Sequence, residues 1–326
     1  MSATIAAVHL VGYGEASEKL VLAREPDPGQ PGPGEVLVAV EFAPINHNDL
    51  MVVWGVYAWR PEPPIAIGNE GAGIVLATGA GVESPRPGDR VVLPFMVRSW
   101  REKVIVPADE VVPLPADADP AQASMMAINA VTAAMLLDDY LALEPGDGIV
   151  FNAATSGLGR WVAALAAQRG LRAVGLVRRR EDVATVREAC PEVDVIADDE
   201  DMTAVRARHE GSTIRLALDG VAGTSTQRLA QLLAPGGTLV SYGAATRQPL
   251  AVPAGDLIFR KITVRGFWEG HPENMARVVP ILRELAGMIG PNSVRQPVAG
   301  IYTLDRLHEA VAHAERRGRV LLDFRS

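Results

Sequence analysis

Short apolar runs separated by turn residues dominate the chain up to about residue 115. Residues 5–10 and 35–42 are two such runs, and the Pro- and Gly-rich stretch 26–34 separates them. Apolar runs of this length, bounded by turn residues, are typical of strands. Short strands at this spacing predict a barrel-like β domain. Three further strands are expected at residues 73–77, 90–94 and 103–106.

From residue 117 onward, helical patterns alternate with strand-like apolar runs. The stretch 120–140 is helical in pattern, and another helix opens at Trp161 behind a strand at 148–151. This alternation predicts an α/β fold with a doubly wound parallel sheet and helices on both faces. Its further strands are expected at residues 171–177, 214–218, 237–242 and 262–266. Beyond residue 270 the pattern predicts a helix at 275–288, a short segment at 296–302, a helix at 305–317 and a strand at 319–324.

The stretch V-F-N-A-A-T-S-G-L-G, residues 150–159, joins the first of these strands to its helix. Small residues let the backbone approach a pyrophosphate, and free N–H groups at a helix start favour its negative charge. The first two glycines of the usual G-x-G-x-x-G fingerprint are replaced by Ala153 and Ser156 in a variant spacing. The pattern favours a dinucleotide-binding turn over an ordinary strand–helix connection.

Composition is ordinary for a soluble α/β protein, since 48% of the 326 residues are hydrophobic and 21% are charged. A formal net charge of -8 argues against a nucleic-acid-binding surface, which needs a basic face. The single cysteine, Cys190, excludes an intramolecular disulfide and a multi-cysteine metal site. No apolar run reaches the roughly 18 residues of a membrane span, and the N-terminus lacks a signal-peptide pattern. We therefore expect a cytoplasmic protein without nucleic-acid or membrane partners.

Several short motifs follow one another in a recognisable order: P-I-N-H-N-D-L (44–50), G-V-Y (55–57), G-N-E-G (68–71), P-G-D-R-V (87–91), S-W (99–100), G-G-T (236–238), S-Y-G (241–243) and R-G-F-W (265–268). In these motifs the chain resembles the medium-chain dehydrogenase/reductase superfamily, and most of all its mitochondrial-type 2-enoyl thioester (trans-2-enoyl-CoA/ACP) reductases. The resemblance implies a GroES-like β-rich catalytic domain, residues 1–117 and 270–326. A Rossmann domain, residues 118–269, would be inserted between them.

Zinc-dependent members of the superfamily place Cys where Asn46 stands and His where Asn69 stands, followed by the glutamate that Glu70 matches. An amide is a poor Zn²⁺ ligand beside thiolate or imidazole. Because His47 lacks co-ligands, a hydrogen-bonded structural role is favoured for it over metal binding. The sequence therefore predicts no metal and no zinc-assisted alcohol oxidation.

The end of the second Rossmann strand distinguishes NAD enzymes from NADP enzymes. An NAD enzyme usually has Asp or Glu there, to accept a hydrogen bond from the ribose 2′-OH. Here Val177 runs into Arg178, Arg179 and Arg180, and guanidinium groups bind a 2′-phosphate in a bidentate way. The alternative is a solvated basic helix start, although basic residues gain nothing from the positive end of a helix dipole. We therefore expect NADPH as the cofactor.

The resemblance implies further cofactor contacts, at the nucleotide turn and near the ends of later strands. Arg319 also has a simpler interpretation, as a surface cation just before the final strand. The implied contacts are Asn129, Thr155, Ser156, Gly157, Leu158, Tyr242, Gly243, Ala244, Ala245, Phe267, Trp268 and Arg319.

Tyr57 occupies the position of the catalytic tyrosine in the enoyl thioester reductases that the chain resembles. Hydride addition to C3 of an enoyl thioester leaves enolate charge on the thioester oxygen, and C2 must then be protonated. A neutral phenol, with an ordinary pKa of about 10, is a suitable donor at neutral pH. Packing in the core is the alternative for Tyr57. Trp100 and Trp268 are expected to shape the acyl or nicotinamide pocket. Asn48 and Asn69 either position the tyrosine loop or serve as structural amides.

Two other functions stay open from the sequence. A zinc-independent quinone or enone oxidoreductase would keep the NADPH site without relying on Tyr57, and a non-catalytic NADPH-binding redox sensor would use the fold for binding alone. Residues 96–100, Asp219 and Ala222 depart from the family pattern, which leaves the acyl-chain length and the thioester preference open. Because relatives often pair through an edge strand of the Rossmann sheet, we expect a homodimer.

Overall fold

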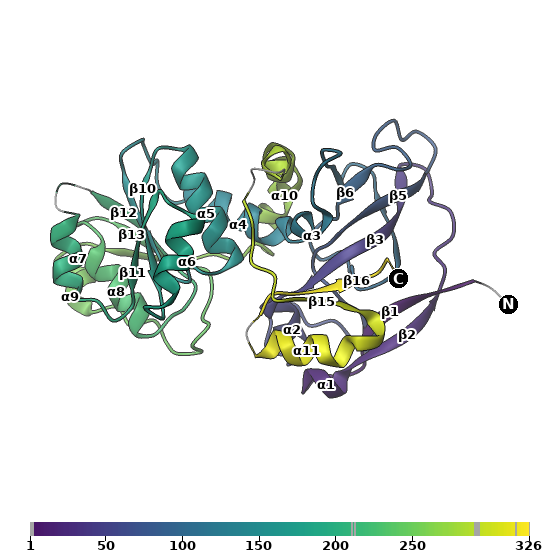
Figure 1. Cartoon of the computed structure of the whole chain (residues 1–326), viewed down its shortest axis with the longest axis horizontal. Helices are drawn as coiled ribbons and strands as arrows, with labels where there is room; N and C mark the ends of the chain where they lie inside the picture. The colour runs from purple at the N-terminus through teal and green to yellow at the C-terminus, as the bar shows by residue number, and fades with distance from the viewer. Residues whose placement is uncertain (1–2, 210, 212, 290–293, 317, 326) are drawn as a thin grey trace. The chain divides into compact units, whose positions relative to one another are not determined.

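The structure, a computed structural model, describes residues 3–209, 211, 213–289, 294–316 and 318–325. The chain forms two compact units, whose ribbons are drawn in Figure 1. Unit 1 comprises Met1–Val131 and Met275–Ser326, and unit 2 comprises Thr132–Asn274. Unit 1 is therefore built from both ends of the chain, and unit 2 from its middle.

Unit 1 contains a seven-stranded sheet in the order β15-β16-β3-β5-β6-β8, with β7 pairing β3. The long strand β3 (Glu35–Ile45) is central, because β5, β7 and β16 all pair with it in antiparallel register. Its side chains Val36, Val38 and Val40 are at most 2% exposed, as their strand-type alternation predicts. The other strands are β5 (Ala72–Thr78), β6 (Arg90–Val92), β7 (Lys103–Pro107), β8 (Val112–Pro113), β15 (Gly300–Thr303) and β16 (Val320–Asp323).

A three-stranded sheet in the order β2-β1-β4 completes the β structure of unit 1. Its strands are β1 (Thr4–Leu10), β2 (Leu20–Pro26) and β4 (Ile65–Ala66). Val8 and Leu10 of β1 share one apolar core with Leu307 and Val311 of the last helix and with β3. The β-rich first part of the chain is therefore confirmed. The helices of this unit are α1 (Ala16–Lys19), α2 (His47–Val53), α3 (Pro120–Ala123) and α11 (Leu307–Glu315), with 3-10 turns at Ala286–Met288 and Leu304–Arg306.

Unit 2 holds a six-stranded sheet in the order β11-β10-β9-β12-β13-β14, and every neighbouring pair is parallel. All four residues of β9 are buried, as expected for a strand covered on both faces. Figure 1 shows α5 and α6 on one side of this sheet and α7, α8 and α9 on the other. The predicted doubly wound sheet is therefore confirmed.

The elements of unit 2 follow the predicted alternation of strand and helix. Its strands are β9 (Gly148–Phe151), β10 (Arg172–Val177), β11 (Val193–Ala197), β12 (Ile214–Asp219), β13 (Thr238–Ser241) and β14 (Thr263–Gly266). Its helices are α5 (Gly157–Gln168), α6 (Asp182–Ala189), α7 (Met202–Arg208), α8 (Thr224–Leu232) and α9 (Ala254–Ile258). Helices α4 (Met126–Asp138) and α10 (Pro272–Leu285) each have residues in both units.

The single helix predicted at residues 120–140 is two helices, α3 and α4. Asp119 starts α3 by accepting from the N–H of Ala121 at 2.9 Å, and the short helix ends at Ser124. The helix predicted at 305–317 begins with a 3-10 turn, and its expected last residue, Arg317, lies outside the described residues. Among the described residues, no helix has the length and apolar character that crossing a bilayer requires.

Candidate active site

Tyr57 lies in unit 1, in the segment that follows helix α2. The main-chain N–H groups of Val56 and Tyr57 donate to the carbonyl of Met51 at 3.0 and 3.2 Å, so the helix end holds the start of this segment. The Tyr57 side chain is half-buried and packs against the core of unit 1. This burial is compatible with either predicted role, proton donor or packing residue.

Buried polar side chains meet at the start of α2. The Asn46 side chain donates to Glu70 Oε1 at 2.9 Å and accepts from Arg319 Nη1 at 2.7 Å. The Asp49 carboxylate accepts from the main-chain N–H of Asn46 at 2.8 Å and from that of Asn69 at 3.1 Å. We call these five residues, Asn46, Asp49, Asn69, Glu70 and Arg319, the Arg319 cluster.

The Arg319 cluster also reaches the first turn of helix α4. Glu70 Oε2 accepts at 2.9 Å from the N–H of Ile128, one of the helix-start donors that have no partner inside a helix. In the orientation that gives its amide complementary partners, Asn129 accepts from Arg319 Nη1 at 2.8 Å. The two expected cofactor residues Asn129 and Arg319 therefore contact each other within unit 1.

Two buried carboxyl groups, those of Asp49 and Glu70, lie close to the half-buried Arg319. Burial raises the pKa of Glu70 to about 7, although Arg319 favours its charged form. Burial also raises the pKa of Asp49 to about 7, and the nearby charge of Glu70 acts in the same direction. The pKa of Arg319 is lowered by burial, while Glu70 and Asp49 oppose the shift. Each of the two carboxyl groups therefore keeps its proton to a higher pH than an exposed carboxyl group does.

Within the part of the chain that the structure describes, no group of three or more His, Cys, Asp or Glu side chains could hold a metal ion. Asn46 and Asn69 are amides, and the cation that Asn46 meets is the guanidinium of Arg319. Asn69 Nδ2 is buried without a hydrogen-bond partner among the described residues. Metal-free chemistry stays a prediction.

Trp100 lies in the core of unit 1. Its side chain is 0% exposed, and its indole N–H donates to the carbonyl of Pro44 at 3.1 Å. A Cβ at Gly68 would lie 2.3 Å from Trp100 Cδ1, so only glycine leaves room for the ring. Trp100 therefore fixes the segment that carries Asn69, and its expected place in a substrate pocket stays a prediction. Asn48 is half-buried on the first turn of α2.

The predicted nucleotide turn forms between β9 and α5 in unit 2. Ser156 is the residue before the helix, and its Oγ accepts from the N–H of Gly159 at 3.0 Å. No acceptor within the described chain meets the main-chain N–H groups of Gly157 and Leu158. Thr155 beside them is exposed. The start of this 12-residue helix therefore offers donors suited to a pyrophosphate.

Ala153 and Gly159 show how the variant turn works without its usual glycines. Ala153 has φ of 53°, a left-handed conformation that side chains rarely adopt. A Cβ at Gly159 would lie 2.7 Å from the carbonyl oxygen of Ala153, so the third glycine of the fingerprint is required. The tight approach of helix and strand is kept, although Ala153 replaces a glycine.

Asn152 and Asp219 form a buried network at the carboxyl ends of the neighbouring strands β9 and β12. Asn152 Nδ2 donates to Asp219 Oδ1 at 2.7 Å, and the N–H of Gly220 donates to Asn152 Oδ1 at 2.8 Å. Thr226 Oγ1 donates to Asp219 Oδ2 at 2.6 Å. Ligands of open α/β sheets bind at this end, where the strand order reverses. Asn152 and Thr226 were not among the residues expected from the sequence. The place of Asn152 directly after a buried strand is a signal for it.

Tyr242 follows β13 and lies on Gly220, where a Cβ would come within 2.6 Å of the Tyr242 ring. Burial raises the pKa of Tyr242, and the charge of Asp219 raises it further, so the hydroxyl stays protonated. That hydroxyl is buried and has no hydrogen-bond partner among the described residues. A buried donor without a partner is costly, which favours a ligand acceptor at this place.

The other expected cofactor residues after strands β13 and β14 are residues 243–245, Phe267 and Trp268. The N–H of Ala245 donates to the carbonyl of Gly220 at 3.2 Å, so residues 242–245, which follow β13, lie beside the end of β12. The N–H of Phe267 donates to the carbonyl of Ser241 at 2.9 Å, which places the residues after β14 beside the end of β13. Phe267 and Trp268 are both half-buried.

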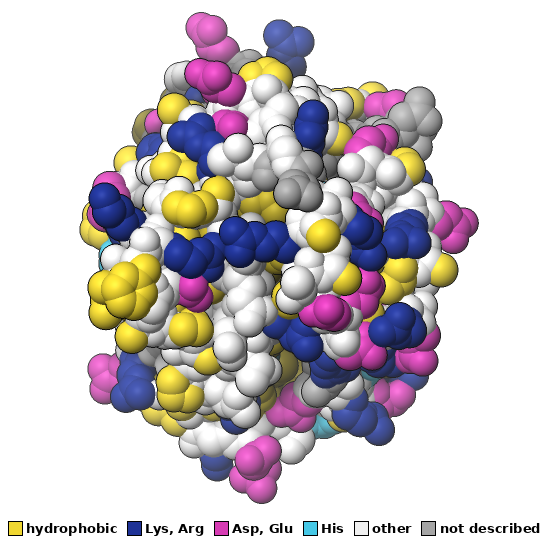
Figure 2. Space-filling view, turned by 90° about the vertical axis from the view of Figure 1, so that its left-hand side faces the viewer, with side chains coloured by type: hydrophobic (Ala, Val, Ile, Leu, Met, Phe, Trp, Pro, Cys, Tyr) yellow, Lys and Arg dark blue, Asp and Glu magenta, His cyan; other side chains and the backbone are white. Residues whose placement is uncertain are grey.

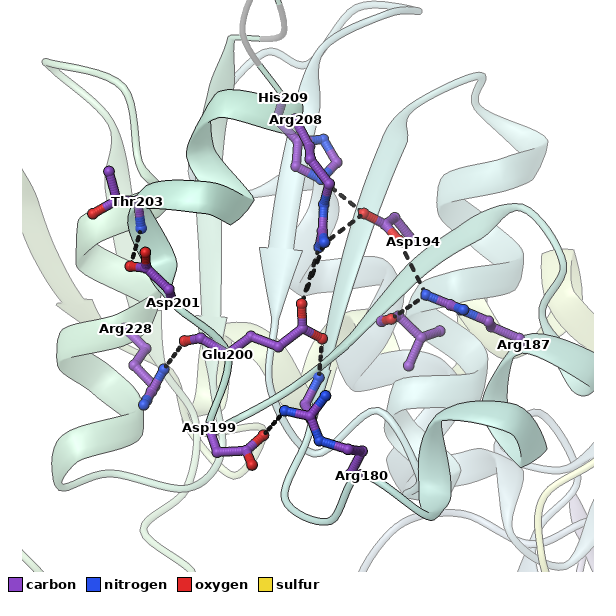
Figure 3. A network of polar contacts seen from close by, with 12 residues as sticks. Arg180, Arg187, Asp194, Asp199, Glu200, Asp201, Thr203, Arg208, His209 and Arg228 are labelled. Carbon is purple, nitrogen blue, oxygen red and sulfur yellow. Dashed lines mark hydrogen bonds and ion pairs between the residues drawn. The ribbon is translucent and has the colours of Figure 1, made fainter.

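The three arginines after β10 are all exposed. Arg179 pairs with Asp182 at 2.8 Å and with Glu181 at 2.9 Å. Figure 3 shows Arg180 pointing to Asp199, with 3.0 Å between Nη2 and Oδ1. No hydrogen bond or ion pair joins Arg178 to another described residue. A 2′-phosphate would therefore find the Arg178 guanidinium without a partner among the described residues, and the Arg179 and Arg180 guanidiniums held by surface ion pairs.

A wider set of ion pairs surrounds Arg180. Asp194 accepts from His209 at 2.9 Å and lies 3.7 Å from Arg187, and Arg208 reaches Glu200 at 3.3 Å (Figure 3). In Figure 2 a row of Lys and Arg side chains crosses the face shown, and acidic side chains lie around it. Basic and acidic side chains are thus mixed on the face that Figure 2 shows.

Two family patterns match the chain. The alcohol dehydrogenase GroES-like domain matches residues 32–116, and the zinc-binding dehydrogenase domain matches residues 157–284. The chain is 34% identical over 271 residues to the mitochondrial enoyl-[acyl-carrier-protein] reductase of Xenopus tropicalis, which covers 79% of this chain and 77% of that protein. These matches agree with a β-rich unit made from both chain ends and a parallel sheet with a nucleotide turn.

Solved structures with the same fold include two kinds of reductase. The complex of Etr1p with NADP and crotonyl-CoA has a TM-score of 0.86 at 23% identity, covering 98% of this chain and 100% of that one. A mycobacterial quinone oxidoreductase has a TM-score of 0.83 at 27% identity, covering 98% and 99%. The fold and the strand-end site define a medium-chain dehydrogenase/reductase. Within that class, the chain belongs to the family of the mitochondrial-type enoyl-[acyl-carrier-protein] reductases.

Proposed function

We propose that the protein reduces the C2=C3 double bond of 2-enoyl thioesters with NADPH, and that Tyr57 supplies the proton to C2. The relationship to enoyl-[acyl-carrier-protein] reductases over most of both chains is the observation that carries this proposal. The half-buried Tyr57, held at the end of α2, supports the role of proton donor. A phenol there can protonate C2 while no metal is needed to polarise the thioester.

The residues of unit 2 fit a nicotinamide dinucleotide. The open N–H groups at the start of α5 suit the pyrophosphate, and exposed Arg178 suits the 2′-phosphate. The buried, partnerless hydroxyl of Tyr242 is a donor for a polar group of the cofactor. NADPH, when bound, supplies the hydride for C3. The network of Asn152 and Asp219 holds the strand ends around this place rigid.

Steady-state turnover tests the proposal directly. Loss of NADPH absorbance is followed with trans-2-enoyl-CoA substrates of several chain lengths, for the wild type and for Tyr57→Phe, with NADH as the cofactor control. We expect turnover that prefers NADPH and falls by about 100-fold or more in Tyr57→Phe, the usual contribution of general acid catalysis. Full activity of Tyr57→Phe would refute the assigned proton donor.

A quinone oxidoreductase is the second candidate, and the 27% identical mycobacterial quinone oxidoreductase of the same fold supports it. A simple quinone accepts hydride without a protein acid at C2, so this activity would not depend on Tyr57. Turnover of quinone but not of enoyl-CoA, unchanged in Tyr57→Phe, would move the protein to this function.

We also propose that the protein is a homodimer that pairs through strand β14. This strand is the last of its sheet and pairs only with β13 among the described strands, so its other edge is open. Next to it, Ile258 is 65% exposed and Phe259 is 83% exposed, which suits an apolar contact. Light scattering of the wild type and of Phe259→Asp tests this: a monomeric wild type would contradict it.

The cytoplasmic location stays a prediction to be tested by imaging, since the relatives are named mitochondrial.

A further inference from the structure

The segment that carries Tyr57 has little secondary structure of its own. It leaves α2 at Val53 and reaches β4 at Ile65, and residues 58–64 form neither helix nor strand. The bonds from Val56 and Tyr57 to Met51 fix only its beginning. Contacts from elsewhere in the chain must therefore define the path of the rest.

Tyr13, which follows β1, supplies these contacts on both sides of Tyr57. Its hydroxyl donates to the carbonyl of Pro61, a buried residue four positions after Tyr57. Its ring lies against Gly55, where a Cβ would come within 3.1 Å of Tyr13 Cγ. Gly55 has φ of +70°, so a larger residue would be strained there as well as crowded.

The neighbouring residue strengthens the same attachment. The N–H of Gly14 donates to the carbonyl of Val53 at 3.0 Å, which is the last residue of α2. Tyr13 and Gly14 together thus touch the segment at its start, at Gly55 and at Pro61. Tyr57 lies between the last two of these points.

We propose that Tyr13 is a positioning residue for the reaction, acting through Tyr57; the inference rests on the proposed function of Tyr57. Tyr13 is 40% exposed and its bond to Pro61 is only partly buried, so loss of the hydroxyl is expected to cost little folding stability. Loss of the bond therefore frees the Tyr57 segment more than it unfolds the protein. A proton donor that is less well held spends less time in the reactive geometry, which lowers kcat.

A double-mutant cycle on the full-length protein tests the proposal. Enoyl-CoA turnover is measured for wild type, Tyr13→Phe, Tyr57→Phe and the double variant. Tyr13→Phe keeps the ring against Gly55 and removes only the hydroxyl. We expect its kcat to fall about three- to tenfold, with KM for NADPH unchanged. The same substitution is expected to have no effect in the Tyr57→Phe background, because the group it positions is gone.

Tyr302→Phe is the matched control. Tyr302 is also a partly buried tyrosine of unit 1, and its hydroxyl pairs with His313 at 2.9 Å, away from the Tyr57 segment. We expect kcat of this variant to stay within twofold of the wild type. Gly55→Ala is a second way to disturb the contact, and its loss of kcat is likewise expected to vanish in the Tyr57→Phe background.

The outcomes separate this inference from the proposed function. If Tyr57→Phe is impaired while Tyr13→Phe and Gly55→Ala are not, the positioning role is overturned and the proton donor stands. Equal losses from Tyr13→Phe with and without the Tyr57 hydroxyl would show general damage and overturn the positioning role too. If Tyr57→Phe keeps full activity, the proton donor assignment fails, and this inference fails with it.

Discussion

Removing the guanidinium of Arg319 gives the sharpest test of the buried cluster in unit 1. Arg319→Met replaces the arginine by an apolar side chain and takes away the cation that, within the described part of the chain, acts on both Glu70 and Asp49. Asn46 loses its 2.7 Å bond, and Asn129 loses its partner at 2.8 Å. Arg319 acts on Glu70 and Asp49 through its charge and through Asn46, so its removal leaves two buried carboxyl groups without a compensating cation. We expect this to cost about 3 kcal/mol of unfolding free energy.

The pH dependence follows from the pKa shifts of the two carboxyl groups. Both pKa values are raised to about 7 by burial, so the folded protein binds more protons than the unfolded chain between about pH 4 and about pH 7. Stability from these groups is present below that window and is lost as pH rises through it. Without Arg319 both pKa values rise further, and the loss continues to higher pH. The destabilisation by Arg319→Met is therefore larger at about pH 8 than at about pH 5.

Urea unfolding of wild type and Arg319→Met at the two pH values measures this effect. Arg306→Met is the control, because Arg306 pairs with Glu309 on the exposed face of the same C-terminal segment and its removal leaves no buried charge. Adding Glu70→Gln to Arg319→Met is expected to restore part of the loss, since one buried charge disappears. A loss that is equal in the two arginine variants, or that grows toward acid pH, would refute the reasoning.

Three further predictions concern unit 2. Replacing Arg178 and Arg180 together by Ala is expected to raise KM for NADPH by about tenfold or more, with little change in KM for NADH, because only NADPH carries the 2′-phosphate. Steady-state kinetics with both cofactors checks this, and equal changes in the two KM values would contradict it. Asp219→Ala is expected to lower the free energy of unfolding by about 2–4 kcal/mol, since Asn152 and Thr226 then lose a buried partner. Urea unfolding measures this change, and a loss below about 1 kcal/mol would argue against a role of Asp219 in fixing the strand ends. Gly159→Val is expected to weaken NADPH binding by about tenfold or more, because its Cβ would lie 2.7 Å from the carbonyl oxygen of Ala153 and displace the turn. Isothermal titration calorimetry measures the affinity of the variant for NADPH, and an unchanged affinity would place the cofactor elsewhere.

The fold was predictable where one strand or helix buries a single, continuous apolar pattern. The strand at 148–151, its turn and its helix were all expected, and β16 (Val320–Asp323) matches the expected final strand closely. Helices α6 and α7 and the strand β11 between them were not predicted. Residues Asp182–Ala189 and Met202–Arg208 bury only one or two side chains each, so the sequence shows almost no apolar stripe there.

The candidate site was predictable in its residue types and less so in its contacts. The turn at 153–159 could be read because helix-start donors and small residues are local features. Arg319 was expected as a cofactor contact from the resemblance alone, because its partner Asn46 lies 273 residues away in the sequence and leaves no local signal. The simpler interpretation was a surface cation before a strand; Arg319 is half-buried and bonded to Asn46 at 2.7 Å, and its role as a cofactor contact stays a prediction. Tyr13 gave no signal, because an aromatic residue beside glycines is common in turns.

The contacts around α2 explain why so many distant segments converge on one short helix. Asn46 lies between strand β3 and helix α2, caps the helix and bonds to both Glu70 and Arg319. Asp49 links the first turn of the helix to Asn69. The far end of the helix holds the N–H of Tyr57. A helix of seven residues has no stability of its own in water, so these buried contacts are what fix its position. Tyr57 is thus held through the helix by a charged cluster on one side and through the loop by Tyr13 on the other, and the two attachments involve no common residue. Because they are independent, Arg319→Met and Tyr13→Phe are expected to lower kcat by factors that multiply, as long as the protein remains folded.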